Sequence, residues 1–501
     1  MGSWLSEREQ RLVAGAETAS AATPVPTQIV SNGEYLPPPQ SEPQRKVERR
    51  IYELADENGK RLGLSRRQFL QTGCGMAAAF LAMNEIHGTG VFGVDAAEAR
   101  EPELIRARAE RLSGQFVVDV QTHFVRDDFN HPELLDLAKY AGDHWNPALK
   151  GDTSSLIRFK FQNYMKEVYY DSDTSIALLS GAPFDDPTWW LLSNEQIVRA
   201  REVVNDFAGS RRLLAHTVIT PKQPGWMDEV DKAISVYKPD SWKSYTIGDP
   251  LGPSKFPWRL DDEKLMYPFY EKAAKAGINI LCIHKGLLPV DYEKSFAGVW
   301  EYATAWDIGK AAKDWPQITF VIYHAALRAF LETPDEAWKE YEATGRIKWA
   351  SDLAEIPQKF GVSNVYAELG TAFANSAVTN PRLAAALVGT LVKGFGADHV
   401  LWGTDSVWYG SPQWQIEALR RLEVPEDIQK KYGLPALGGP DSPIKQAIFG
   451  TNAARLYRLR LRAAAAPMPA YSTDRLTQLK RDYDLAAREP SNLRYGYVRT
   501  G

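Results

Sequence analysis

Several side chains that can bind a metal ion or move a proton follow short apolar runs that lie far apart in the chain. They are Gln121 and His123 after residues 116–120, His284 at the end of 278–284, His324 at the end of 318–324, and Asp405 at the end of 399–405. Imidazole nitrogens and carboxylate or amide oxygens are ligands for divalent ions, and His and Asp also serve as general acids and bases. Brought together, these residues predict a metal-dependent active site.

Each of these residues has a structural explanation when it is taken alone. A single histidine at a strand end is usually a hydrogen-bonded structural residue, and Asp405 could cap a helix that begins near Ser411. Their joint placement at the ends of several predicted strands favours the functional interpretation.

The elements that must position these residues are visible as a regular alternation of apolar runs and amphipathic segments. The eight runs are residues 116–120, 175–180, 213–218, 241–246, 278–284, 318–324, 364–369 and 399–405. Helix signals lie between them: Asn380 and Pro381 start PRLAAALVGTLVKG, and DDEKLMYPFYEKAAKAG closes on Gly277. Strands that alternate with helices form a parallel sheet, and eight such units predict an α/β fold, the (β/α)8 TIM barrel.

In such a barrel the C-terminal ends of all strands open on one face, where the active site lies. Three further residues are predicted to contact substrate there: Lys243 near the end of the fourth run, Glu368 near the end of the seventh, and Trp408 just beyond Asp405. Their structural alternatives, which the sequence leaves open, are a salt bridge for Lys243, a helix cap for Glu368 and lid packing for Trp408.

Five sequence blocks carry a resemblance to a known family. DVQTHF, LCIHKG, VIYHAA, LWGTDS and IFGTNAARLY resemble the motif blocks of the amidohydrolase superfamily, in the branch of aminocarboxymuconate-semialdehyde decarboxylase and the "amidohydrolase family 2" enzymes. The resemblance covers roughly residues 115–460. It implies one divalent metal ion, Zn²⁺ first and Mn²⁺ second, held by Gln121, His123, His284 and Asp405. It also implies catalytic roles for His324 and Asp405.

Gln121 is the departure from the family pattern, which has histidine at this position. A neutral amide oxygen can replace an imidazole, but it should bind the metal more weakly. Some decarboxylases of this branch resemble the chain in carrying Glu here, and Gln is nearly isosteric with Glu.

Three functions therefore stay open. The first expectation is a metal-dependent hydrolase that attacks a small ester, lactone or amide with metal-activated water. The alternative is a non-oxidative decarboxylase (a carboxy-lyase) of an aromatic or unsaturated acid. The third is a non-catalytic periplasmic binding protein on a degenerate barrel.

The regions outside the predicted barrel domain (residues 100–460) suggest export. LSRRQFL, the apolar GCGMAAAFLAM and the AEAR site, which allows cleavage after Ala99, resemble a twin-arginine signal at residues 65–99. We expect a disordered leader at residues 1–64, a helical tail at 461–501, passage through the twin-arginine export machinery and a periplasmic location. The alternative is an ordinary arginine pair that caps an N-terminal helix.

Composition excludes other classes of function. The 501 residues carry a net charge of −4, which gives no reason to expect nucleic acid as a partner. Cys74 and Cys282 are the only cysteines, so disulfide frameworks and Cys-rich metal sites are excluded. No apolar run reaches the ~18–20 residues of a stable membrane span. The expected partner is a small-molecule substrate, and the family resemblance allows a homodimer.

GTGVFG at residues 88–93 spells the dinucleotide fingerprint G-x-G-x-x-G. That motif works only when a strand precedes it, and the preceding residues are Ala-rich. We therefore do not expect a dinucleotide site here.

Overall fold

Eight parallel strands form the centre of the protein. The computed structural model describes residues 23–27, 40–88, 90–129, 159–289, 291–328, 334–459 and 473–485. The strands lie side by side in sequence order, from β1 to β8. They are β1 Val118–Thr122, β2 Ile176–Leu179, β3 Leu213–Val218, β4 Ser241–Tyr245, β5 Ile280–His284, β6 Thr319–Tyr323, β7 Val365–Glu368 and β8 Val400–Leu401.

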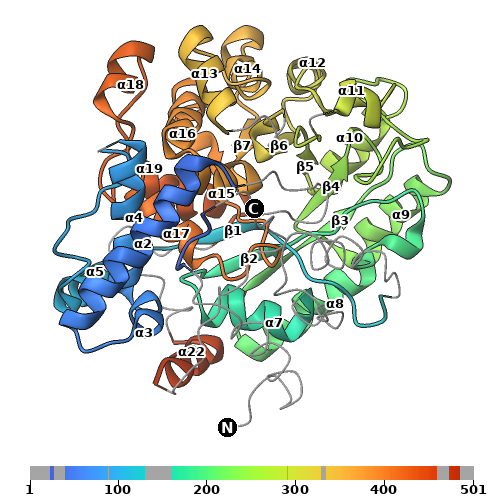
Figure 1. Ribbon diagram of the computed structural model, residues 1–501. Coiled ribbons are helices and arrows are strands. Elements are labelled where there is room, and N and C mark those ends of the chain that lie inside the picture. Colours follow the sequence, from blue (N-terminus) through green and yellow to red (C-terminus); the bar gives the residue numbers. More distant parts are fainter. Residues whose placement is uncertain are drawn as a thin grey trace.

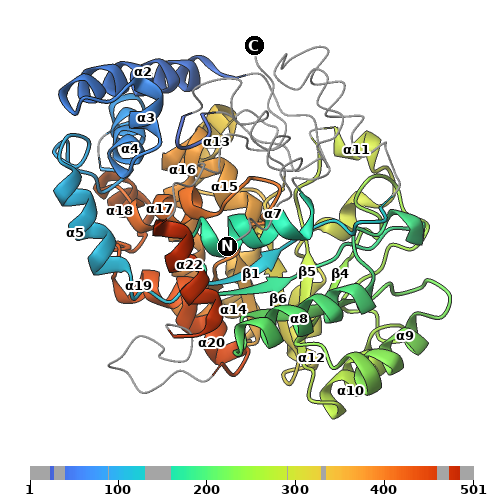
Figure 2. The ribbon, with the colours of Figure 1, turned by 90° about the horizontal axis from the view of Figure 1, so that it is seen from below.

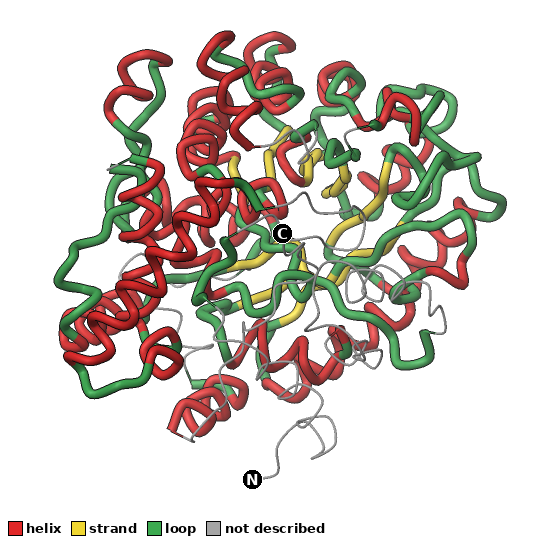
Figure 3. The backbone as a smooth tube through the Cα atoms, in the orientation of Figure 1, coloured by secondary structure: helices red, strands yellow, loops and turns green. Residues whose placement is uncertain are grey.

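Backbone hydrogen bonds between β1 and the segment after β8 close the sheet into a barrel. The amide of Val120 donates to Trp402 O (3.0 Å), and the amide of Asp405 donates to Gln121 O (2.9 Å). One residue further along, the amide of His123 donates to Ser406 O at 2.6 Å. The predicted (β/α)8 TIM barrel is confirmed, and Figures 1 and 3 show the strands at the centre with helices around them.

All eight predicted strands are present, with small shifts in their ends except in β8, which ends at Leu401, so that Asp405 lies four residues beyond the strand. The strands are buried along almost their whole length, as expected where helices cover the outside of a parallel sheet and side chains fill its inside. β1 begins two residues later than the predicted run, so Gln121 lies inside the strand and only His123 follows it. β8 is the shortest strand, with two residues.

Helices surround the strands, and several more lie against one side of the barrel. They are α2 Glu42–Arg61, α3 Arg66–Leu70, α4 Gly73–His87, α5 Pro102–Leu112, α7 Phe161–Met165, α8 Asn194–Ala208, α9 Trp226–Lys232, α10 Tyr267–Lys275, α11 Tyr292–Ser295, α12 Ile308–Asp314, α13 Pro334–Thr344, α14 Ala350–Phe360, α15 Gly370–Thr379, α16 Pro381–Phe395, α17 Gln413–Arg421, α18 Glu426–Tyr432, α19 Pro443–Gln446, α20 Asn452–Leu456 and α22 Arg475–Leu485. Among the described residues, no helix is long and apolar enough to cross a membrane.

The helix signals in the sequence act as predicted. Asn380 Oδ1 accepts the amide of Leu383 (3.1 Å) at the start of α16, and Pro381 occupies the first helical position. That helix ends at Phe395, one residue beyond the predicted stop. α10 starts only at Tyr267, six residues into the segment DDEKLMYPFYEKAAKAG. α22 lies in the described part of the predicted helical tail, residues 473–485, and residues 461–472 and 486–501 lie outside the described ranges.

The prediction of a disordered leader over residues 1–64 is wrong for residues 42–61, which form α2. Ser41 caps this helix together with Gln44 in a reciprocal capping box. Val47 and Ile51 are buried, and α2 packs against α4. Tertiary packing thus stabilises a segment whose charged composition looked disordered. Residues 1–22 and 28–39 of the predicted leader lie outside the described residues.

The predicted signal segment forms α3 and α4, and α4 packs into the protein. Phe80 of α4 is fully buried, and its ring centroid lies 4.7 Å from that of Phe92. Phe92 pairs with Leu422 at the end of α17. Ala99, before the predicted cleavage point, is 1% exposed. Figure 2 shows α2, α3 and α4 grouped beside α16. Because α4 and not a strand precedes GTGVFG, the context of a dinucleotide site is missing, as expected.

The packing of α4 can be measured by one substitution. Phe80→Ala should lower the free energy of unfolding by about 3 kcal/mol, because it opens a cavity between α4 and the loop that carries Phe92. Chemical denaturation of the full chain measures this value, and Leu104→Ala, at a side chain 40% exposed, is the control. Equal stabilities of the two variants would contradict the docking of α4.

Candidate metal centre and active site

Four predicted site residues meet at the C-terminal mouth of the barrel. Asp405 Oδ1 lies 3.1 Å from His123 Nε2 and accepts a hydrogen bond of 3.1 Å from Gln121 Nε2. Gln121 Nε2 also lies 3.2 Å from His324 Nε2. All four side chains are buried. Residues from both ends of the barrel sequence thus form one continuous polar chain, in the order His123, Asp405, Gln121, His324.

Thr371 orients two members of this chain. Its hydroxyl donates to Asp405 Oδ2 (2.6 Å) and lies 2.7 Å from the hydroxyl of Tyr409. Its backbone amide donates to His324 Nδ1 at 3.2 Å. Thr371 lies in the first turn of α15, directly after β7. Its two hydrogen bonds fix both the carboxylate of Asp405 and the imidazole of His324.

His324 and Asp405 both have the left-handed backbone conformation that is rare for residues other than glycine. Their φ angles are 58° and 60°, and Ala325 and Ala326 follow His324 with φ 50°. Glu368 stabilises the turn at His324, since its Oε2 accepts the backbone amide of that residue at 2.9 Å. Backbone strain of this kind is concentrated at functional sites.

Asp119 fixes the strand that carries Gln121. Its carboxylate accepts the amide of Gln121 (3.1 Å) and the amide of Thr404 (3.0 Å), and the hydroxyl of Thr404 donates to its other oxygen. Burial raises the pKa of Asp119 to about 7 against these hydrogen bonds. Asp119 therefore joins β1 to the segment after β8 directly beneath the polar chain.

Two glycines leave room for this arrangement. A Cβ at Gly403 would lie 1.9 Å from Glu368 Oε1. A Cβ at Gly370, where φ is +37°, would lie 2.6 Å from His324 Nδ1 and 2.9 Å from both Gln121 Oε1 and Glu368 Oε1. An added Cβ would therefore displace site side chains at both positions.

Gly403→Ala should lower the free energy of unfolding by roughly 1–3 kcal/mol, because the Glu368 carboxylate must move to make room. Urea denaturation checks the value. Gly252→Ala, where an added Cβ meets nothing within 4 Å, is the matched control. A Gly403→Ala variant as stable as that control would contradict the close packing of Glu368.

His284 and Lys243 lie on the other side of His324. The His284 ring stacks on Tyr245 (centroids 4.2 Å apart) and meets the His324 ring edge-on at 4.7 Å. Lys243 Nζ lies 3.5 Å from the centroid of the Tyr323 ring and 5.2 Å from that of Tyr245. Lys243 is thus buried over aromatic faces, and its predicted contact with substrate stays a prediction.

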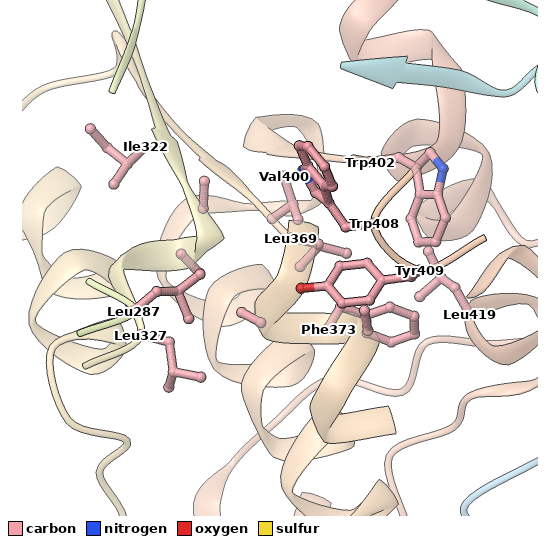
Figure 4. Packing of buried hydrophobic residues seen from close by; sticks show 14 of the residues in the cluster. Leu287, Ile322, Leu327, Leu369, Phe373, Val400, Trp402, Trp408, Tyr409 and Leu419 are labelled. Atoms are coloured by element: carbon pink, nitrogen blue, oxygen red, sulfur yellow. The ribbon is translucent and has the colours of Figure 1, made fainter. Parts of the chain in front are cut away.

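Aromatic side chains line the His123 side. The Trp408 ring lies 5.9 Å from the His123 ring and 5.0 Å from that of Phe159, measured between centroids. Figure 4 draws Trp408 and Tyr409 in the same apolar cluster as Leu369 and Phe373. The predicted substrate contact of Trp408 stays a prediction, while its packing is established.

The site fixes distinct protonation states. Burial would raise the pKa of Asp405, but the hydrogen bond and charge of His123, with the charge of His324, lower it to about 2. Burial lowers the pKa of His324 to about 3 and that of His284 well below its ordinary value. Burial raises the pKa of Glu368 to about 8. At neutral pH the site therefore combines an ionised Asp405 with neutral rings at His284 and His324.

The donor set fits a divalent cation only when Gln121 is included. Among the described residues, no group of three or more His, Cys, Asp or Glu side chains is arranged to hold a metal ion. With the amide of Gln121 added, however, two side chains, those of His123 and Gln121, meet at Asp405 Oδ1, which makes a set of three candidate ligands. Four buried atoms at this face have no hydrogen-bond partner in the described part of the chain: Gln121 Oε1, Glu368 Oε1, His123 Nδ1 and His284 Nδ1. Buried acceptors without a partner are costly, and a cation would satisfy some of them.

Sequence reasoning missed Thr371, Tyr409 and the role of Asp119. Thr371 follows the seventh apolar run by two residues, so its place at a strand end was a usable signal. Asp119 lies in the first run itself, where a charged residue in a buried strand indicates a specific partner. His216, in the middle of β3, is buried against Tyr323 and belongs to the barrel interior.

A family comparison supports the amidohydrolase resemblance. Residues 247–459 match the family model described as "Amidohydrolase". The match includes His284, His324 and Asp405, whereas Gln121 and His123 lie outside it. The search of curated proteins found no relative of this chain.

Among the solved structures whose backbones align with this chain are the following three. An uncharacterised TIM-barrel protein from Bordetella bronchiseptica is 13% identical, with a TM-score of 0.42 and coverage of 68% of this chain and 98% of that chain. The 2,6-dihydroxybenzoate decarboxylase from Rhizobium is 14% identical, with a TM-score of 0.40 and coverage of 69% of this chain and 99% of that chain. The 5-carboxyvanillate decarboxylase from Sphingomonas paucimobilis is 14% identical, with a TM-score of 0.38 and coverage of 69% of this chain and 100% of that chain. At these scores the likenesses say nothing about the reaction or substrate of this chain.

Proposed function

We propose that this protein is a metal-dependent hydrolase of the amidohydrolase type that acts on a small ester, lactone or amide. The convergence of His123 Nε2 and the Gln121 amide on Asp405 Oδ1, each at 3.1 Å, carries the proposal. These groups lie at the barrel mouth where TIM-barrel enzymes have their active sites. The match of residues 247–459 to the amidohydrolase family supports the same class.

Gln121, His123, His284 and Asp405 would hold the ion, with Zn²⁺ as the first candidate and Mn²⁺ as the second. A divalent cation bound here supplies Lewis-acid polarisation and makes a water acidic enough to lose a proton near neutral pH. Asp405 is ionised at neutral pH, since its pKa is lowered to about 2 in spite of burial, so it offers a negative ligand and a proton acceptor.

His324 is suited to donate a hydrogen bond to the substrate. Because the backbone amide of Thr371 donates to Nδ1, the proton of the neutral ring sits on Nε2, which lies 3.2 Å from Gln121 Nε2. A neutral N–H donor stabilises negative charge on a substrate oxygen without first having to lose a positive charge. His324 would therefore polarise the carbonyl and assist the leaving group once the substrate oxygen replaces Gln121 as the partner of its Nε2–H group.

Decarboxylation of an aromatic or unsaturated acid is the second candidate. Two aromatic rings favour it, because Tyr245 stacks on His284 and Trp408 lies beside His123, so flat surfaces flank the polar chain. In that reaction a water positioned by His324 would protonate the carbon as CO₂ leaves, and Asp405, ionised at neutral pH, would stay a metal ligand.

Product analysis separates the two reactions. Zn²⁺- and Mn²⁺-loaded full chain would be incubated with panels of lactones, esters and amides and with hydroxybenzoates, and acid release and CO₂ release would be measured. Hydrolysis of at least one carbonyl compound, lost in Asp405→Asn, is the expected result. CO₂ release without hydrolysis would establish the second candidate, and inactivity of metal-loaded protein on every panel would favour a non-catalytic binding protein.

We further propose export through the twin-arginine pathway to the periplasm, on the basis of LSRRQFL, the apolar segment and the AEAR site. Cleavage after Ala99 would remove α4 and Glu98, whose carboxylate pairs with the buried Arg421 at 2.6 Å. Cell fractionation followed by N-terminal sequencing tests this proposal. A cytoplasmic protein with its original N-terminus would contradict it.

A further inference from the structure

The tautomer of His324 places a hydrogen-bond donor opposite a donor of Gln121. The amide of Thr371 donates to His324 Nδ1, so the proton of the neutral ring lies on Nε2. This Nε2–H group faces Gln121 Nε2, another donor, at 3.2 Å. In the opposite tautomer the proton lies on Nδ1, and this N–H group then faces the backbone N–H of Thr371, so two donors still face each other.

A second conflict lies on the other side of the same amide. Gln121 Oε1 and Glu368 Oε1 are both buried acceptors without a partner among the described residues. Both lie 2.9 Å from the point that a Cβ on Gly370 would occupy. Two acceptors therefore crowd around this glycine, while two donors face each other at His324.

Rotation of the Gln121 amide by half a turn resolves both conflicts. Its nitrogen would then donate to Glu368 Oε1, and its oxygen would accept the Nε2–H of His324. A proton on Glu368 could satisfy the two oxygens without the rotation, but the two donors at His324 would still face each other.

The rotated amide creates one new requirement. Its oxygen takes the position 3.1 Å from Asp405 Oδ1, where the nitrogen now donates. Two oxygens at this distance repel each other unless a cation lies between them. The amide oxygen and Asp405 would then be neighbouring ligands of one ion, beside His123 Nε2.

We propose that Glu368 is a positioning residue that turns the Gln121 amide oxygen toward the metal, so that a neutral glutamine can serve as a ligand. The proposal rests on the metal site of the proposed function. The Glu368 carboxylate has two tasks: Oε2 accepts the backbone amide of His324 at 2.9 Å, and Oε1 accepts the Gln121 amide in the metal-bound state.

The Glu368→Gln substitution separates these tasks. Its carbonyl oxygen can still accept the His324 amide, but its new NH₂ group donates to Gln121 Oε1 and so favours the orientation with nitrogen toward Asp405. We expect the Kd for Zn²⁺ to rise about 10- to 100-fold, the usual effect of losing a partner that orients a metal ligand. Competition with a zinc-binding dye on the full chain measures the Kd. Glu423→Gln, whose carboxylate pairs with Lys445 away from the site, is the matched control.

The specific signature of this role is that the effect of Glu368→Gln on Zn²⁺ affinity changes sign when Gln121 is replaced by Glu. In a Gln121→Glu background, Glu368 would face a second carboxylate, so Glu368→Gln should now strengthen Zn²⁺ binding by supplying a donor to that carboxylate. A merely structural role of Glu368 would weaken binding in both backgrounds. An effect of the same sign in both, or a Glu368→Gln Kd equal to that of wild type, would overturn the proposal.

Two further outcomes are informative. If Glu368→Gln does not fold, the crystal structure of the Zn²⁺-loaded wild type decides: the Gln121 amide nitrogen within about 3.2 Å of Glu368 is expected, and a longer separation overturns the proposal. Wild-type protein that binds no Zn²⁺ at all would overturn both this proposal and the proposed function. Zn²⁺ binding that is indifferent to Glu368 would overturn this proposal alone.

Discussion

Replacement of Asp405 by Asn should reduce kcat/KM by on the order of 10³-fold and weaken metal binding together with it. The substitution keeps the shape of the side chain but removes the negative charge on which His123 and Gln121 converge. It also removes the only carboxylate among the predicted ligands. Steady-state kinetics and a Zn²⁺ titration on the same preparation measure both effects.

Asp398→Asn is the control for this substitution. Asp398 lies just before β8, at the opposite end of the strand from the site, and its side chain is 58% exposed. The control should match wild type in both measurements. An Asp405→Asn enzyme that keeps wild-type kcat/KM would contradict the role of Asp405 in catalysis and metal binding.

The His324→Asn variant should lose roughly 10²- to 10⁴-fold in kcat while it keeps its metal. Asparagine tolerates the left-handed backbone at this position, where φ is 58°, but it is too short to place a donor where Nε2 lies. His324 contacts Gln121 and is not itself a predicted ligand, so the ion should stay bound. Kinetics combined with elemental analysis distinguishes this outcome from that of Asp405→Asn.

His399→Asn provides the comparison, since His399 lies at the N-terminal end of β8 and bonds the carbonyl of Ser363. It should behave as wild type. A large loss of metal in His324→Asn would assign His324 to the coordination shell, and unchanged kcat would remove its catalytic role.

The fold could be predicted because a parallel barrel has a simple physical signature. Strands that are buried on both faces appear as short apolar runs, and helices separate them. The run LLAHTV matched β3 residue for residue. The N-terminal helix α2 could not be predicted in this way, because the burial of Val47 and Ile51 depends on α4 and not on local composition.

Only those residues of the candidate site that lie at or just beyond the ends of predicted strands could be predicted. His123, His324 and Asp405 were predicted because their residue types and positions agree with metal and acid–base chemistry, and the structure places them close together. Thr371 and Asp119 act through hydrogen bonds to other site residues, which leave no pattern in one sequence. The consequence of Gln121 depends on which way its amide faces between Asp405 and Glu368, and only the three-dimensional arrangement raises that question.

The metal content of the purified full chain shows whether the barrel holds a divalent ion. Elemental mass spectrometry would be applied to wild type and to Asp405→Asn after reconstitution with Zn²⁺ or Mn²⁺ and removal of unbound ions. We expect close to one divalent ion per wild-type chain and a clear loss in the variant. Folded wild-type protein without a bound ion would contradict a metal site at Asp405.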